Sequence, residues 1–158
     1  MMIMWSKYKT DKYLDGKIKE LNDIYNKIPE LKCQENCHEC CGATRWLPIE
    51  YFNIKRFLDN LGLKERNMKT MFEMCPYIED NKCIIYPVRP IICRLFGVVN
   101  YNKTLKSKAL GKEVRFQASM ICPDVKIDNY LTTEESKEIM KKIINLIPDE
   151  ILGEIYEQ

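Results

Sequence analysis

Residues 33–41 read Cys33-Gln34-Glu35-Asn36-Cys37-His38-Glu39-Cys40-Cys41, so half of the chain's eight cysteines fall within one short run. The remaining four follow downstream at Cys75, Cys83, Cys93 and Cys122. Cysteine thiolates are the soft ligands that zinc and iron–sulfur clusters require, and short spacers let neighbouring sulfurs converge on one centre. The pattern predicts a metal site, with all eight cysteines as candidate ligands.

Two other uses of so many thiols fit the chain less well. A disulfide framework requires an oxidising compartment, yet the N-terminus has no sustained apolar run of the kind that a secretory signal carries. Adjacent cysteines such as Cys40 and Cys41 also do not readily bridge each other. Ordinary buried thiols would be scattered through apolar segments, whereas these lie in polar stretches interrupted by glycine and proline. We therefore expect a cytoplasmic protein with reduced cysteines.

Length and charge limit the possible partners. A chain of 158 residues suits one domain spanning residues 1–158, with the cysteine-cluster region at 33–123. The net charge of +2, with 30% charged residues, lacks the dense basic stripe of a nucleic-acid binder, and we interpret residues 103–112 as a solvated loop. No segment is apolar for long enough to span a bilayer. Neither a nucleic acid nor a membrane is expected as a partner.

Apolar residues at helical spacing predict a mainly α fold. A first stripe predicts a helix over residues 7–28 that Pro29 ends, and Pro48 begins a second helix that Gly62 caps. A short third helix is expected at residues 63–74. Thr132 and Glu135 have the capping-box pattern before a further helix, and a short extra helix is expected at residues 149–156.

The stretch over residues 75–94 holds the second group of cysteines. Two short apolar strands flank residues 79–82 and predict a β-hairpin that brings Cys75 and Cys83 together. Pro90 favours the first turn of a short helix that carries Cys93 and Arg94. The expected fold is therefore a small single domain of four or five helices, with a short β-hairpin and cysteine-rich loops around a metal centre.

This downstream stretch resembles the YkgJ-like, or CxxCxxCC, cysteine-cluster family, which is described as a candidate zinc- or iron-chelating domain. The resemblance rests on Cys75-Pro76, Cys83-Ile84-Ile85-Tyr86 and Arg89-Pro90-Ile91-Ile92-Cys93-Arg94. The upstream run departs from the family pattern, because three residues separate Cys33 from Cys37 where the family usually has two. The resemblance spans roughly residues 33–122 and implies metal or iron–sulfur binding by these cysteines. Biochemical roles across the family are mostly unassigned, and a related cysteine cluster occurs in flagellin lysine methylases.

The number of cysteines leaves the kind of metal centre open. Eight could fill two tetrahedral zinc sites, and four suffice for one [4Fe–4S] cluster. The spacing of Cys33, Cys37 and Cys40 is similar to the cluster motif of radical S-adenosylmethionine enzymes, although the chain is too short for their barrel. We expect an iron–sulfur cluster, with zinc as the alternative. The division of the cysteines between one centre and two stays open.

Polar residues beside the cysteines add candidates of a different kind. Arg45, Arg89 and Arg94 could donate hydrogen bonds to the sulfurs around a cofactor or bind an anionic partner, and Arg89 and Arg94 could instead pair with surface carboxylates. The only histidine, His38, could complete a mixed cysteine and histidine site, but a solvated loop position is favoured.

Three functions follow from these alternatives. An iron–sulfur protein would act in electron transfer or a redox maturation reaction, together with a protein partner. A structural zinc module would serve as an adaptor, and a metal carrier would bind its metal exchangeably. The chain has no Walker loop, dinucleotide fingerprint or GxSxG elbow, so phosphoryl transfer, hydride transfer and serine hydrolysis have no support. Whether the protein is an enzyme stays open.

Overall fold

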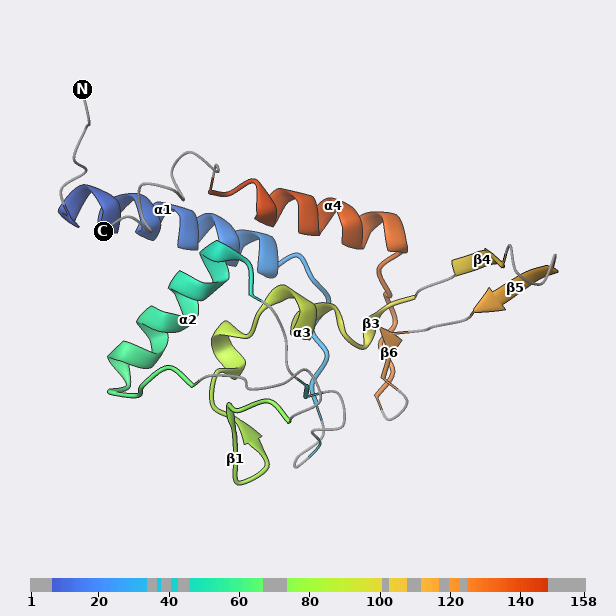
Figure 1. The fold of residues 1–158 in the computed structure, drawn as a ribbon, viewed down its shortest axis with the longest axis horizontal. Coiled ribbons are helices and arrows are strands. Elements are labelled where there is room, and N and C mark those ends of the chain that lie inside the picture. Colours follow the sequence, from blue (N-terminus) through green and yellow to red (C-terminus); the bar gives the residue numbers. More distant parts are fainter. Residues whose placement is uncertain are drawn as a thin grey trace.

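A computed structural model describes residues 7–33, 37, 41–42, 46–66, 74–100, 103–107, 112–116, 120–122 and 125–147. Helices dominate these residues, which form four α-helices, one short 3₁₀ helix and three two-stranded antiparallel sheets (Figure 1). The expected mainly α domain with a β-hairpin is thus confirmed in outline. The described residues contain more strand than the sequence predicted.

Two long helices, α1 (Lys7–Tyr25) and α4 (Thr133–Ile144), lie side by side along one edge of the molecule (Figure 1). The predicted capping box starts α4, because Glu135 N donates to Thr132 Oγ1 at 3.2 Å and Thr132 N donates to Glu135 Oε2 at 2.8 Å. The first helix ends at Tyr25, earlier than predicted. The chain tightens there before Pro29, since Ile28 N bonds the Tyr25 carbonyl at 3.0 Å.

The second helix, α2 (Pro48–Asn60), has the boundaries that its sequence predicts. Pro48 occupies its first turn, where a missing N–H costs nothing. Gly62 follows its C-terminal end with φ of +68°, the left-handed conformation that glycine adopts at little cost.

The predicted hairpin is also confirmed. β1 (Ile78–Glu79) pairs with β2 (Lys82–Cys83), and the turn residues Asp80 and Asn81 have φ of 47° and 60°. Positive φ at both central positions suits a tight two-residue hairpin turn. A 3₁₀ helix, η1 (Tyr86–Val88), follows, and then α3 (Ile91–Leu95), which carries Cys93 and Arg94 as expected. Pro90 lies at the residue that caps α3 rather than in its first turn.

The remaining strands correct one interpretation. β3 (Val98–Val99) pairs with β6 (Met120–Ile121), and β4 (Lys103–Ser107) pairs with β5 (Lys112–Phe116) in a hairpin that projects from the rest of the fold (Figure 1). The prediction of a loop at 103–112 is therefore wrong for residues 103–107 and 112. Strand formers such as Leu105, Val114 and Phe116 lie among the lysines, and pairing between the two segments satisfies their backbones. Counting charges alone concealed this pattern.

Two other helix predictions fall partly or wholly outside the described residues. Residues 63–66 are not helical, and Met74 forms an isolated bridge with Gly42, so the third predicted helix is absent from these described positions. Residues 67–73 and 148–158 lie outside the described part of the chain. No helix in the described ranges is long and apolar enough to cross a membrane.

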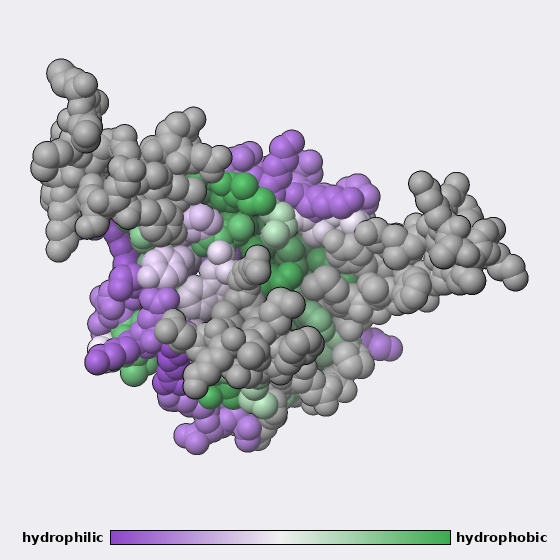
Figure 2. Space-filling view, viewed as in Figure 1, coloured by the Kyte–Doolittle hydropathy of each residue, from purple (hydrophilic) through white to green (hydrophobic). Residues whose placement is uncertain are grey.

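The described buried apolar residues form two clusters. The helical core joins α1, α3, α4, β3 and the start of α2, and consists of Leu14, Leu21, Tyr25, Ile28, Leu31, Ile49, Ile91, Leu95, Val98, Val99, Ile143, Leu146 and Ile147. The hairpin core joins the middle of α2 to the β1–β2 region and consists of Ile54, Leu58, Tyr77 and Ile85. On the face drawn in Figure 2, hydrophilic residues follow much of the rim and apolar residues reach the surface near the middle.

Candidate metal centre

The upstream and downstream cysteine segments meet in space. Gly42 and Met74 form an antiparallel bridge, and the next residue, Cys75, donates its backbone N–H to the Cys41 carbonyl at 3.1 Å. The bridge places Cys41 beside Cys75 although the whole of α2 separates them in the sequence.

The β1–β2 hairpin adds a third cysteine to this place. Ile78 N bonds the Cys75 carbonyl at 3.2 Å, and Ile78 is the register partner of Cys83. Burial raises the pKa of the Cys83 thiol, and the nearby thiols of Cys75 and Cys33 raise it further, while the Arg89 guanidinium lowers it. The hairpin thus brings Cys75 and Cys83 together, as its sequence predicted, and Cys33 lies within electrostatic reach.

Cys33 reaches this place because the segment before it is held at Leu31 by two kinds of contact. Leu31 is buried in the helical core, and its carbonyl accepts a hydrogen bond from Tyr86 Oη at 3.2 Å. In Figure 1 the chain after α1 descends past α3 toward the β1 hairpin. The Tyr86 hydroxyl is therefore a structural donor that ties η1 to the segment before Cys33.

The other candidate ligands have different surroundings. Cys37 and Cys93 are half-buried, the latter on α3. Cys122 packs against the helical core beside Gly97, where φ is +86° and an added Cβ would lie 2.6 Å from Leu31 Cδ2 and 3.2 Å from Cys122 Cβ. Cys40, His38 and Arg45 lie outside the described residues.

The described cysteines suit a soft metal by their chemistry. Six of the seven described cysteines are half-buried, and Cys33 is exposed. Burial raises the pKa of Cys75 as well as that of Cys83, so both thiols are protonated at neutral pH until a cation favours the thiolate. This donor set fits zinc or iron. Within the described ranges, no three Cys, His, Asp or Glu side chains are grouped closely enough to hold one metal ion.

The two arginines of this region stack on aromatic rings. The Arg89 guanidinium carbon lies 4.0 Å from the centroid of the Tyr86 ring, and that of Arg94 lies 4.0 Å from the centroid of the Tyr25 ring. Neither is within ion-pair distance of a carboxylate in the described part of the chain. Arg89 acts electrostatically on Cys83, and the expectation that Arg89 and Arg94 support a bound cofactor stays a prediction.

A buried carboxylate connects the site to the helices, and sequence reasoning missed it. Glu50 on α2 is 1% exposed and accepts hydrogen bonds from Tyr25 Oη at 2.6 Å, Ile91 N at 2.5 Å and Leu47 N at 2.9 Å. It therefore joins α1, α2 and α3. A glutamate three residues after the capping residue of a helix is a capping signal, but the leucine at the cap position concealed it. Burial and the neighbouring carboxylate raise the pKa of Tyr25 far above its ordinary value, so Tyr25 stays a neutral donor.

Comparison with known proteins gives one match, over the part of the chain that contains all eight cysteines. The model of the family CxxCxxCC, described as "Putative zinc- or iron-chelating domain", matches residues 32–123. No curated protein and no solved structure matches the chain. The matched range covers more than half of the sequence and coincides with the region where the cysteine segments meet. The chain therefore belongs to the CxxCxxCC family of zinc- or iron-chelating domains.

Proposed function

We propose that the chain holds an iron–sulfur cluster through its cysteines and acts in electron transfer or a redox maturation reaction with a protein partner. The set of neighbouring thiols carries the proposal. Cys33, Cys41, Cys75 and Cys83 are linked as neighbours, by a backbone hydrogen bond between Cys41 and Cys75 and by the electrostatic effect of Cys75 and Cys33 on Cys83. Four thiolates suffice for one [4Fe–4S] cluster.

These four cysteines would form the nearest ligand set, with Cys37, Cys40, Cys93 and Cys122 as the further candidates. A bound cluster would supply one-electron redox chemistry. The protein would supply half-buried thiols and a guanidinium close to one of them. A positive charge beside a thiolate stabilises the thiolate, so Arg89 would support ligation by Cys83. Thiolates that ligate a metal need a reducing environment, which favours the cytoplasm.

Anaerobic purification followed by iron, zinc and acid-labile sulfide analysis tests the proposal. We expect iron with equivalent sulfide and a visible absorption band that dithionite bleaches. A colourless protein that holds zinc without sulfide would overturn the cluster and direct attention to a structural or carrier role.

A matched pair of variants then tests the ligand set. Cys83→Ser is expected to lose most of the bound metal, because serine is a poor ligand for soft metals. Lys82→Ser changes the neighbouring exposed residue of the same strand, and this variant is expected to keep its bound metal. Equal metal content in the two variants would remove Cys83 from the site.

A further inference from the structure

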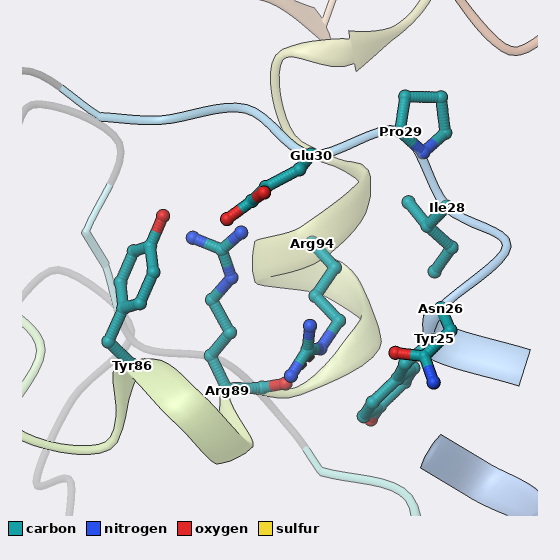
Figure 3. Close-up of a pocket in the computed structure, with 8 residues that line it drawn as sticks. All are labelled: Tyr25, Asn26, Ile28, Pro29, Glu30, Tyr86, Arg89 and Arg94. Atoms are coloured by element: carbon teal, nitrogen blue, oxygen red, sulfur yellow. Dashed lines mark hydrogen bonds between the residues drawn. The ribbon is translucent and has the colours of Figure 1, made fainter. Parts of the chain in front are cut away.

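A cavity lies between the segment that follows α1 and the segment that leads into α3. Its volume is about 310 Å³, and its wall includes Tyr25, Asn26, Glu30, Tyr86, Arg89 and Arg94. Figure 3 shows the two arginines side by side in this pocket, with the ring of Tyr86 on one side of Arg89 and the carboxylate of Glu30 facing its guanidinium. Arg89 and Arg94 thus line the pocket from the α3 side, and the exposed side chain of Glu30 lines it from the segment after α1.

Arg89 has unused hydrogen-bonding capacity in this pocket. It is only 9% exposed, and its Nε is buried without a hydrogen-bond partner in the described part of the chain. A buried N–H without an acceptor is costly, and such groups are normally paired. Its stacking on Tyr86 holds the guanidinium plane but satisfies none of its donors. An acceptor that enters the pocket would meet a preorganised cation.

Arg94 contributes in a different way, because two of its donors bond to the backbone. Its Nε donates to the Arg89 carbonyl at 2.9 Å and its Nη2 donates to the Pro87 carbonyl at 2.8 Å. These bonds fix the backbone that carries Arg89, and stacking on Tyr25 anchors Arg94 to α1. Arg94 is therefore a positioning residue that also adds positive charge to the wall.

The walls favour an organic acid over an inorganic anion. The wall is mostly polar, but Ile28, Pro29 and the tyrosine rings add a smaller apolar part that a short carbon chain can contact and an inorganic anion cannot. The volume is at the lower end of the range for small-molecule pockets, roughly 300–1,000 Å³. The Glu30 carboxylate in the wall disfavours a multiply charged phosphate. We propose that this pocket binds a small organic monocarboxylate, whose carboxylate group is held by Arg89. The inference is independent of which metal the cysteines hold.

Calorimetric titration of the full chain, with its metal as purified, tests this at constant ionic strength. The probes are butyrate, n-butylammonium with the same carbon skeleton, and inorganic phosphate. We expect saturable binding of butyrate with a dissociation constant on the order of millimolar, and weaker or no binding of the other two. Binding of phosphate more tightly than butyrate, or no saturation by butyrate, would overturn the proposal.

Variants identify the residue that holds the carboxylate. Arg89→Lys keeps the charge but loses the planar donor fork, so butyrate should bind roughly tenfold more weakly. Arg56→Lys is the matched control at an arginine that pairs with Asp11 and Asp15 on α1, and it should bind like the parent. Glu30→Gln should tighten binding by about threefold, because it removes a like charge that competes for the same guanidinium. Unchanged or weaker binding by the Glu30 variant, or equal binding by the two arginine variants, would contradict this assignment.

Discussion

The helical core and the hairpin core differ in how many apolar side chains they bury. Among the described residues, the helical core contains thirteen buried apolar side chains, from all four α-helices, β3 and the segments that follow α1 and α4, whereas the hairpin core contains four. The cysteines divide with them, since Cys75 and Cys83 pack against the hairpin core and Cys122 against the helical core. Apolar burial can stabilise the helical core by itself, whereas the described part of the hairpin core buries fewer apolar side chains beside the polar cysteine segments. The comparison suggests that bound metal does for the hairpin core what apolar area does for the helical core.

The largest effect is expected on removing the metal. Structural metal ions can contribute on the order of 10 kcal/mol to folding, so chelation should unfold the cysteine segments, β1 and β2. The paired helices α1 and α4 should stay folded. Hydrogen exchange followed by mass spectrometry, before and after chelation, would show lost protection near residues 74–85 and retained protection in α1. Unchanged exchange, circular dichroism and thermal melting would show that the metal has no structural role.

Changing one leucine to alanine in each core compares how much each core contributes to stability, with and without metal. Leu21 in the helical core is 0% exposed and Leu58 in the hairpin core is 1% exposed, so each change to alanine removes a similar buried volume. Leu21→Ala should cost about 2–5 kcal/mol with or without metal. Leu58→Ala should have that effect only in the metal-loaded protein, because the hairpin core is already lost without metal. Urea titrations of both variants in both states measure this, and equal losses for Leu58→Ala in both states would break the comparison.

Glu50 joins α1, α2 and α3 through partners that all belong to or pack against the helical core, so its removal should weaken that core. Glu50→Gln replaces one acceptor oxygen with an amide donor that faces backbone or hydroxyl donors, and should cost roughly 2–4 kcal/mol. Tyr25→Phe removes only one of the three bonds and should cost about 1–2 kcal/mol. Chemical denaturation gives both values. A Glu50 variant no less stable than the Tyr25 variant would mean that the backbone bonds from Leu47 and Ile91 contribute little.

The smallest effect is expected at the N-terminus of α4, a helix that carries none of the cysteines. Thr132→Ala should cost about 1 kcal/mol through loss of the cap. Hydrogen bonds from Thr132 lower the pKa of Glu135. The stability that these bonds to the carboxylate add is present above the unfolded pKa of that carboxyl, and it is lost as the pH falls through the folded pKa. A carboxyl titration by NMR should show the pKa of Glu135 closer to its ordinary value in the variant. Metal content should not change, and a loss of metal would show that α4 supports the cysteine region.

Local signals of the sequence were sufficient for several elements. Pro48 and Gly62 marked the ends of α2, the Thr132 and Glu135 pair marked the start of α4, and the polar residues 79–82 marked a hairpin turn. Each of these signals acts within a few residues along the chain, through a fixed φ, a cap or a turn. The charged segment 103–107 was misread because its stability depends on pairing with 112–116, which no single window contains.

The sequence by itself determined that this chain belongs to a family of zinc- or iron-chelating domains, because the cysteines and their short spacings are properties of the chain. Only the tertiary structure decided which cysteines become neighbours. The bridge between Gly42 and Met74 and the Tyr86 bond to Leu31 are long-range contacts, and the order of residues does not reveal them. The same holds for Glu50 and Arg89, whose roles depend on burial. Burial arises when separate segments pack together and exclude water, and a sequence pattern does not show which segments will pack together.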